Sequence, residues 1–166
     1  MHPERTLVLI KPDGVERGIV GKIITRFEDA GLKMVGLKLQ LVDQEFAQKH
    51  YREDLAKRRG EKVRRQMVEM LSSGPVVAMV IEGIEAIETV RKIVGPTEPK
   101  SAPPGTIRGD FSHMSYAWAD SRDVGVRNVI HASSSAEEAQ IETALWFAET
   151  EIINYRTVHE RHVHGQ

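Results

Sequence analysis

Short apolar runs and amphipathic stretches alternate along the chain, in the pattern of a small domain that mixes strands and helices. Residues 6–10 and 76–82 are runs of strand-forming apolar residues, whereas residues 33–42 alternate between apolar and polar positions. The alternation predicts that one face of this strand carries Val35, Leu37, Leu39 and Leu41.

These patterns and their end signals give the expected elements. Strands are predicted at Thr6–Ile10, Lys33–Val42, Val76–Glu82 and Asn128–His131. Helices are predicted at Ile19–Ala30, as a helical pair across Asp43–Leu71, at Ile84–Val94, at Ser135–Phe147 and as a short helix near Glu151–Tyr155. Asp43 is the expected N-cap of the helical pair, and Gly31 ends the helix before it.

The order of these elements predicts the fold. It is βαββαβ, which gives an α+β, ferredoxin-like domain: a four-stranded antiparallel sheet with helices on one face, plus a long proline-rich loop at residues 95–111. Fold alone does not give function, because the same arrangement serves RNA-binding and regulatory modules. An RNA-binding domain of this kind needs exposed aromatics on its central strands, and residues 76–82 contain none.

Composition sets broad limits. The 166 residues suit a single domain, expected at residues 1–158, and residues 159–166 are expected to be a flexible tail with His159, His162 and His164. The formal net charge of −1 argues against a nonspecific nucleic-acid binder, and the lack of cysteine excludes thiolate chemistry. The apolar stretch at residues 76–81 is too short to span a membrane, and residues 1–5 do not begin a signal peptide. We therefore expect a cytoplasmic protein.

His131 stands where a predicted strand meets a predicted helix. Ser134 is the expected N-cap, and Glu137 would complete a capping box. The imidazole would then lie at the positive end of a helix, where phosphate groups bind. Glu142, about two turns into this helix, can orient the ring and set its tautomer. Taken alone, a histidine at a strand end is more often structural, so the rest of the chain has to decide.

Several cations accompany this histidine. Lys11 ends the first apolar strand and precedes a Pro-Asp-Gly turn, and a lysine there is costly to bury unless it meets an anion. The proline-rich loop is restricted in conformation and presents Thr97 and Arg108, with Arg91 on the helix before it. Three cations in these positions predict a clamp for a polyphosphate.

Four motifs occur in a fixed order: Lys11-Pro-Asp-Gly-Val, Ser73-Gly-Pro-Val-Val-Ala-Met-Val, Pro104-Gly-Thr-Ile-Arg-Gly-Asp-Phe111 and Asn128-x-x-His131-x-Ser133. In this combination, from about Glu4 to Tyr155, the chain resembles the nucleoside diphosphate kinase family. The resemblance implies transfer of the γ-phosphate from a nucleoside triphosphate to a nucleoside diphosphate, by a ping-pong mechanism through a phosphohistidine.

Matched position by position, the resemblance also implies roles for single residues. His131 would be the nucleophile, Glu142 its orienting carboxylate and Ser133 a hydroxyl that hydrogen-bonds one of the two. Tyr51 falls on the family's tyrosine near the catalytic histidine. Phosphates and ribose would be held by Lys11, Arg91, Thr97, Arg108 and Asn128. Mg²⁺ would arrive with the nucleotide, bridging its phosphates, and not in a metal site of the protein.

The chain departs from the family's pattern in four places. Ala132 and Ser134 replace the family's Gly and Asp, and Glu98 replaces the Asn of an Asn-Pro pair. The base-stacking phenylalanine falls near Val63, within residues 57–65, a segment longer by roughly four residues and rich in cations. Residues 112–127 are also longer, by roughly ten, and place Tyr116 and Trp118 at strand-like spacing. This extra segment is either a hairpin arm for subunit contact or a wall near the nucleotide.

We therefore predict a nucleoside diphosphate kinase of the cytoplasm. Its expected substrates are nucleoside di- and triphosphates, and it is expected to form a homo-hexamer or homo-tetramer. We expect it to bind neither a membrane nor a specific nucleic acid. The alternative is a catalytically inactive, nucleotide-binding regulatory module on the same fold. The presence of His131, Glu142 and Lys11 together argues against that alternative.

Overall fold

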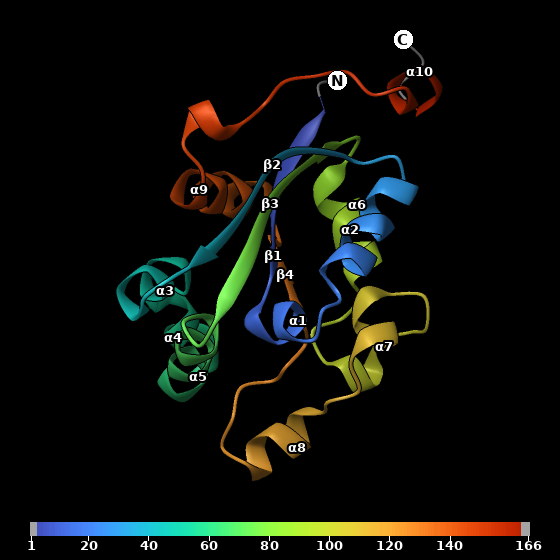
Figure 1. Ribbon diagram of the computed structural model, residues 1–166. Helices are drawn as coiled ribbons and strands as arrows, with labels where there is room; N and C mark the ends of the chain where they lie inside the picture. The colour runs from blue at the N-terminus through green and yellow to red at the C-terminus, as the bar shows by residue number, and fades with distance from the viewer. Residues whose placement is uncertain (1–2, 164–166) are drawn as a thin grey trace.

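A computed structural model describes residues 3–163 of the chain (Figure 1). The strands are β1 (Glu4–Ile10), β2 (Lys33–Leu41), β3 (Pro75–Gly83) and β4 (Ile130–Ala132). The helices are α1 (Pro12–Glu16), α2 (Val20–Asp29), α3 (Gln44–His50), α4 (Glu53–Arg59), α5 (Glu61–Leu71), α6 (Ala86–Val94), α7 (Ile107–Phe111), α8 (Tyr116–Ser121), α9 (Ala136–Trp146) and α10 (His159–Val163). Two 3₁₀ turns, η1 (Pro99–Ser101) and η2 (Glu149–Glu151), complete the list.

The sheet has the strand order β2-β3-β1-β4, and each neighbouring pair is antiparallel. This order confirms the predicted ferredoxin-like topology. Because β1 lies between β3 and β4, the end of β1 meets β4, and Leu9 pairs with His131. Lys11, just beyond β1, is thereby brought to the same end of the sheet as the strand that carries the histidine.

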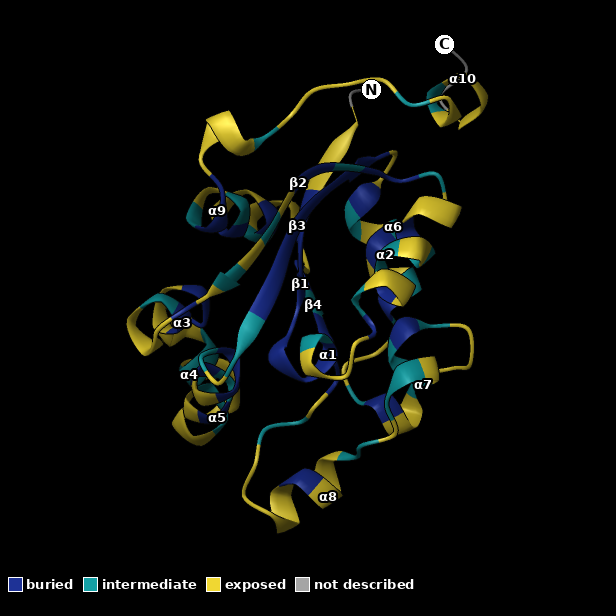
Figure 2. Ribbon diagram, viewed as in Figure 1, coloured by how far each residue is buried: buried dark blue, intermediate teal, exposed yellow. Residues whose placement is uncertain are grey.

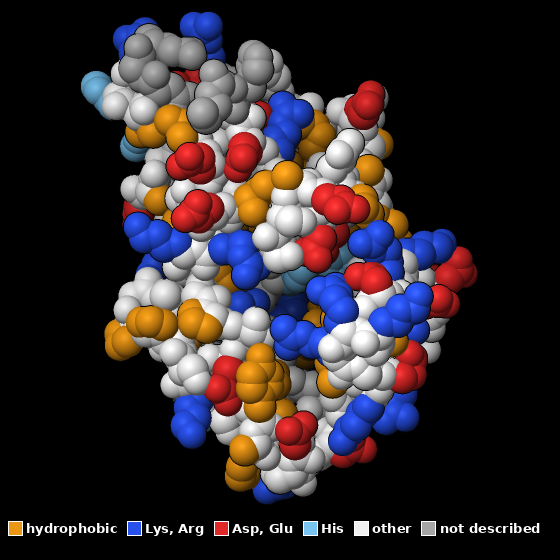
Figure 3. Space-filling model, turned by 180° about the vertical axis from the view of Figure 1, so that it is seen from behind, with side chains coloured by type: hydrophobic (Ala, Val, Ile, Leu, Met, Phe, Trp, Pro, Cys, Tyr) orange, Lys and Arg blue, Asp and Glu red, His pale blue; other side chains and the backbone are white. Residues whose placement is uncertain are grey.

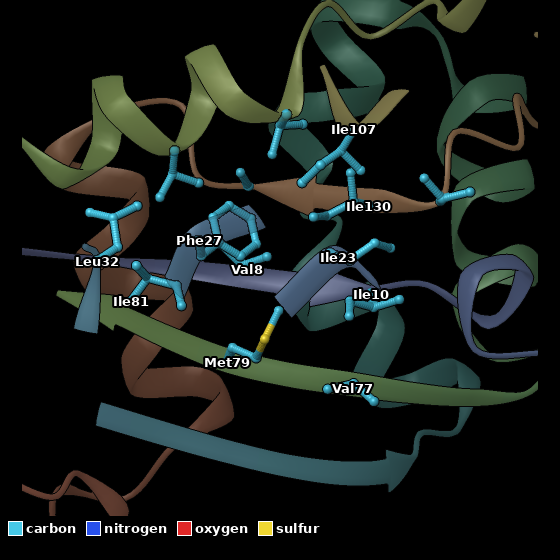
Figure 4. Packing of buried hydrophobic residues seen from close by; sticks show 14 of the residues in the cluster. Val8, Ile10, Ile23, Phe27, Leu32, Val77, Met79, Ile81, Ile107 and Ile130 are labelled. Atoms are coloured by element: carbon cyan, nitrogen blue, oxygen red, sulfur yellow. The ribbon is translucent and has the colours of Figure 1, made fainter. Parts of the chain in front are cut away.

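Helices cover both faces of the sheet, so the expectation of a single covered face is wrong (Figure 1). Side chains of β1 alternate between two apolar clusters: Val8 and Ile10 lie in one, Leu7 and Leu9 in the other. The first cluster includes Ile23 of α2 and is seen closely in Figure 4, whereas the second includes residues of α3, α5 and α9. The unbroken apolar run of β1 follows from burial on both sides.

The outer strand β2 is half covered. A register shift between Met34 and Gly36 places Val35 in a bulge, where it joins the cluster under α3, α5 and α9. Leu37 and Leu39 pair with Met79 and Val77, which belong to the opposite cluster, so the prediction of one face for Val35 and the leucines is wrong. The second half of the strand is exposed in Figure 2: Leu37, Leu39 and Leu41 are 54%, 67% and 76% accessible.

The structure corrects other local expectations. Three helices, α3 to α5, replace the predicted pair, because Arg52 and Gly60 break the segment, while Asp43 caps α3 as predicted. The cap of α9 is Ser135, which accepts from Glu138 N, and not Ser134 with Glu137. The predicted proline-rich loop contains two short helical elements, η1 and α7.

The elements near the C-terminus also differ from expectation. Glu149–Glu151 form a 3₁₀ turn, so the short helix predicted near Glu151–Tyr155 is wrong. Of the predicted tail, His159–Val163 form α10, and His164 lies outside the described residues. Within α10, Glu160 accepts from the Lys33 ammonium at 2.8 Å, which ties the helix to the sheet. No helix in the range 3–163 is long and apolar enough to cross a membrane.

Candidate active site

A cleft of about 720 Å³ opens at the end of the sheet where β1 and β4 meet. Figure 3 shows it as a hollow with histidine inside and Lys and Arg side chains around it. Its walls come from distant parts of the chain, namely the end of β1, α3 to α5, α6, α8, β4 and α9. All but one of the predicted site residues line it: Lys11, Tyr51, Val63, Arg91, Thr97, Arg108, Asn128, His131 and Glu142. The exception, Ser133, is fully buried behind Glu142.

His131 is held by Glu142. Both carboxylate oxygens lie at 3.0–3.1 Å from His131 Nε2, and the Ser133 hydroxyl donates to the same carboxylate at 2.5 Å. Burial alone would raise the pKa of Glu142, but the neighbouring His131 ring lowers that pKa to about 2. An ionised carboxylate only accepts, so Nε2 carries the proton and Nδ1 keeps its lone pair.

The backbone before His131 is strained. Val129 has φ of 61°, a conformation that β-branched residues rarely adopt. It is fixed there by two bonds: its N–H donates to Asp13 Oδ2 at 3.0 Å, and its carbonyl accepts from Lys11 N at 2.9 Å. Strain that the surroundings hold in place is common at functional sites, and here it sets the entry into the short strand of His131.

A second histidine lies behind the first. The ring of His50 is perpendicular to that of His131, with 4.7 Å between centroids, and its Nδ1 accepts from Trp146 Nε1 at 3.2 Å. Burial lowers the pKa of His50 to about 3, and His131 adds to this effect, so His50 is neutral. Burial and the Glu142 carboxylate raise the pKa of the Tyr51 phenol, which therefore stays protonated. The wall behind His131 thus adds no charge.

Lys11 is the first cation of the predicted phosphate clamp along the chain. Its ammonium donates to Asn128 Oδ1, and Asn128 Nδ2 donates to the Thr97 carbonyl at 2.7 Å. Burial lowers the pKa of Lys11 to about 8, with Asp13 opposing and Arg108 and the neighbouring Arg127 adding to the shift. Lys11, Asn128 and Thr97 thus come from three separate segments and form one chain of hydrogen bonds.

The arginines differ in how firmly they are held. Arg108 donates to the carbonyls of Gly95 at 2.9 Å and Ile130 at 2.7 Å, while its buried Nε has no partner within the described part of the chain. Burial lowers the pKa of Arg108 to about 10, and the charge of Arg91 adds to the shift. Arg91 is exposed on α6 and lines the same cleft.

At its other end the cleft has an apolar lining beside the charged residues of α4. Val63 and Met67 of α5 and Leu55 of α4 line one side. The opposite side is α8, so residues 116–121 are a helix and the hairpin prediction is wrong. Tyr116 lines the cleft, whereas Trp118 is not among the lining residues. The Arg122 Cζ atom lies over the Trp118 ring, 4.7 Å from the ring centre. The extra segment therefore forms a wall of the cleft, which was the other prediction for it.

Some residues of the cleft were missed in the sequence. His50 is not among the site residues predicted from the sequence, although its position next to Tyr51 is a usable signal. Arg58 and Arg59 line the cleft, although the sequence marked this segment only as rich in cations. Asp120 also lines it, and nothing in the sequence pattern marked that residue.

Known proteins similar to this chain belong to one family. The family model described as nucleoside diphosphate kinase matches residues 4–152. The nucleoside diphosphate kinase of Borreliella burgdorferi is 46% identical over 154 residues, 92% of each chain, and that of Pyrococcus furiosus is 47% identical over 92% of this chain and 88% of its own. A solved structure titled a transition state mimic of nucleoside-diphosphate kinase from Borrelia burgdorferi with bound vanadate and ADP matches with a TM-score of 0.97. It is 44% identical and covers 99% of this chain and 98% of its own. An NDP kinase from Pyrobaculum aerophilum matches with a TM-score of 0.86 and 39% identity, over 92% of this chain and 100% of its own.

Proposed function

This chain belongs to the nucleoside diphosphate kinase family, and we propose that it moves the γ-phosphate between nucleotides through a phosphohistidine on His131. The observation that carries the proposal is the pairing of His131 Nε2 with Glu142. That pairing commits Nε2 to a proton and leaves Nδ1 as the nucleophilic nitrogen. The relative from Borrelia burgdorferi was solved as a transition state mimic with vanadate and ADP, which supports the same reaction here.

The reaction would run in two balanced displacements. The Nδ1 lone pair attacks the γ-phosphorus, an N–P bond forms, and the bond to the β,γ-bridging oxygen breaks, so that the diphosphate leaves with the electron pair. A second diphosphate then attacks the phosphohistidine through a terminal β-phosphate oxygen and takes the phosphoryl group. The charge that builds on the His131 ring is balanced by the ionised Glu142 beside it.

The cations would position the phosphates and not react themselves. Arg108 is braced by two backbone carbonyls, so its guanidinium is oriented before the nucleotide binds. Lys11 supplies a point charge, and Asn128 holds it in place. Arg91 and Thr97 stand at the open side of the cleft and would hold the outer phosphates and ribose. A regulatory module that only binds nucleotide would not need the Glu142 contact to His131.

Magnesium would reach this site with the nucleotide. Among the described residues, the one group of three possible ligands that converges is His50, His131 and Glu142, which the proposed reaction already uses. The cleft offers mostly cations, and this suits an ion carried on phosphate oxygens and not in a cage of carboxylates. When bound, Mg²⁺ would neutralise charge on the phosphates. We also propose a cytoplasmic location, because nucleoside di- and triphosphates occur there.

The proposal is tested by following the phosphate. Incubation with γ-labelled ATP, removal of free nucleotide and addition of unlabelled GDP should yield labelled GTP. His131→Ala should fold but take up no label, whereas His113→Ala, a change at an exposed histidine outside the cleft lining, should label normally. Undiminished acid-labile labelling of His131→Ala would overturn the assignment.

We also propose a homo-oligomer, a tetramer or hexamer. Leu37, Leu39 and Leu41 form an exposed apolar row on an outer strand, and such strands commonly pair with another chain. Light scattering should give a mass several times 18.7 kDa. Leu39→Glu should reduce that mass, while Val158→Glu, at a site 76% exposed and away from the sheet, should not. A monomer at micromolar concentration would refute the proposal.

A further inference from the structure

The short helix α8 presents one face to the cleft. Tyr116, Ala119 and Asp120 all line it, and positions three and four apart in sequence share one side of a helix. Trp118 falls on another side, where Arg122 covers its ring. The direction of the Asp120 side chain therefore follows from the helix register, which turns Asp120 and Tyr116 toward the same space.

The helix is fixed in position. Asp123, just after α8, pairs with Lys62 at 2.8 Å and accepts from Gln66 Nε2 at 3.1 Å, so the end of α8 is tied to α5. At the other end, the Tyr116 N–H donates to Glu98 Oε1 at 2.9 Å. A wall held at both ends keeps its side chains in place against a ligand, as discrimination between similar ligands requires.

The proposed reaction sets how a nucleotide would lie in this cleft. Its phosphates would meet His131, Lys11 and Arg108 at the end of the sheet, and its base would extend toward the apolar end. There its ring faces would lie between Val63 and Met67 of α5 and the ring of Tyr116 on α8. The polar edge of the base then meets whatever hydrogen-bonding groups this end of the cleft offers.

Asp120 is the carboxylate still available there. Of the acidic residues that line the cleft, Asp54 pairs with Arg58 at 2.9 Å, Glu138 accepts from Ser134 N at 3.0 Å and Glu142 holds His131. The side chain of Asp120 has no hydrogen bond or ion pair within residues 3–163. Gln66, the amide nearby, is already committed to Asp123.

We propose that Asp120 makes this enzyme favour guanine nucleotides by accepting from the N1–H and the 2-amino group of the base. A carboxylate has acceptors only, and guanine presents two adjacent donors on one edge. Adenine and cytosine place a ring nitrogen acceptor beside their single amino group, and that lone pair would face the carboxylate. Uracil and thymine place carbonyls on both sides of their one N–H. The inference rests on the proposed function, because it concerns the base of the same substrates.

The experiment compares acceptor diphosphates under one donor triphosphate. In the wild type, kcat/KM should be about tenfold higher for GDP than for ADP, and IDP, which lacks the 2-amino group, should fall between them. Asp120→Asn should lower the value for GDP and raise it for ADP, because an amide accepts from the adenine amino group and donates to the neighbouring ring nitrogen. A simple loss of packing or charge would not change the two substrates in opposite directions.

The matched control is Asp29→Asn, a change at an exposed acidic residue at the end of α2 that does not line the cleft. It should leave the GDP to ADP ratio unchanged. If Asp120→Asn also leaves that ratio unchanged while phosphate exchange continues, the inference is wrong and the proposed function stands. If exchange is absent in the wild type, the proposed function itself fails.

Discussion

The two ends of the cleft are built in opposite ways. Around His131, polar side chains from different elements hold one another, as with Lys11 and Asn128 or Glu142 and Ser133. At the base end, the lining comes from α4, α5 and α8, and it includes apolar side chains such as Leu55, Val63 and Met67 that need no polar partner. The difference teaches that the reacting end has little freedom to change, because each change leaves a buried partner unsatisfied. The base end can vary in sequence and length without disturbing the chemistry.

The largest effect should come from breaking the reacting end at Glu142. Glu142→Gln keeps the size of the side chain but removes the charge that balances the His131 ring and allows the wrong tautomer. The rate of phosphate exchange should fall about 100-fold or more. Steady-state kinetics of exchange measure it, and Glu138→Gln on the same helix, whose carboxylate is bonded to Ser134, serves as the control. A loss of less than fivefold in Glu142→Gln would mean that Glu142 does not set the state of the ring.

The next largest effect should be a pH dependence of nucleotide affinity that comes from Lys11 at the reacting end. Its pKa of about 8 lies within reach of ordinary buffers, so nucleotide affinity that depends on its charge should fall by up to about tenfold per pH unit above 8. Binding titrations at several pH values measure this. Lys11→Met should bind weakly at each pH tested and lose the slope, and a slope retained in that variant would assign the titration to another group.

The same group predicts an opposite trend for stability. The folded-state pKa lies below the ordinary value of 10.5, so between pH 8 and 10.5 the unfolded chain binds more protons at this position. The contribution of Lys11 to the free energy of unfolding is therefore unfavourable below pH 8 and improves as pH rises toward 10.5. The stability difference between Lys11→Met and wild type, from denaturant unfolding without nucleotide, should shrink over that range.

The smallest effect should come from the base end. Tyr116 is the aromatic of α8 that lines the cleft, so Tyr116→Ala should raise the KM for nucleotides about fivefold with little change in kcat. Trp118→Ala also removes an aromatic ring from α8, but on the other side of the helix, and it should leave KM unchanged. If instead Val63→Phe lowers KM and Tyr116→Ala has no effect, the base lies against α5 alone.

Much of the fold could be read from the sequence, because the signals are local. Apolar periodicity located the four strands, and Asp43 and Gly31 mark helix ends through backbone effects confined to one turn. The single-face prediction for the sheet failed for a physical reason. An unbroken apolar run in β1 indicates burial, but whether helices cover one face or two depends on the rest of the chain. The bulge at Val35 was likewise invisible, since alternation continues through it in the sequence.

By itself, the sequence determined the composition of the site: a histidine after a strand, a carboxylate two turns into the next helix, and cations at a strand end and in a stiff loop. Tertiary structure alone decided which nitrogen of His131 is committed, that neutral His50 stands behind it, and that Tyr116 and not Trp118 faces the cleft. The physical reason is the distance along the chain over which each effect acts. Capping and periodicity act within a few residues, whereas ring orientation, burial and the pKa values that follow depend on segments brought together only when the sheet closes.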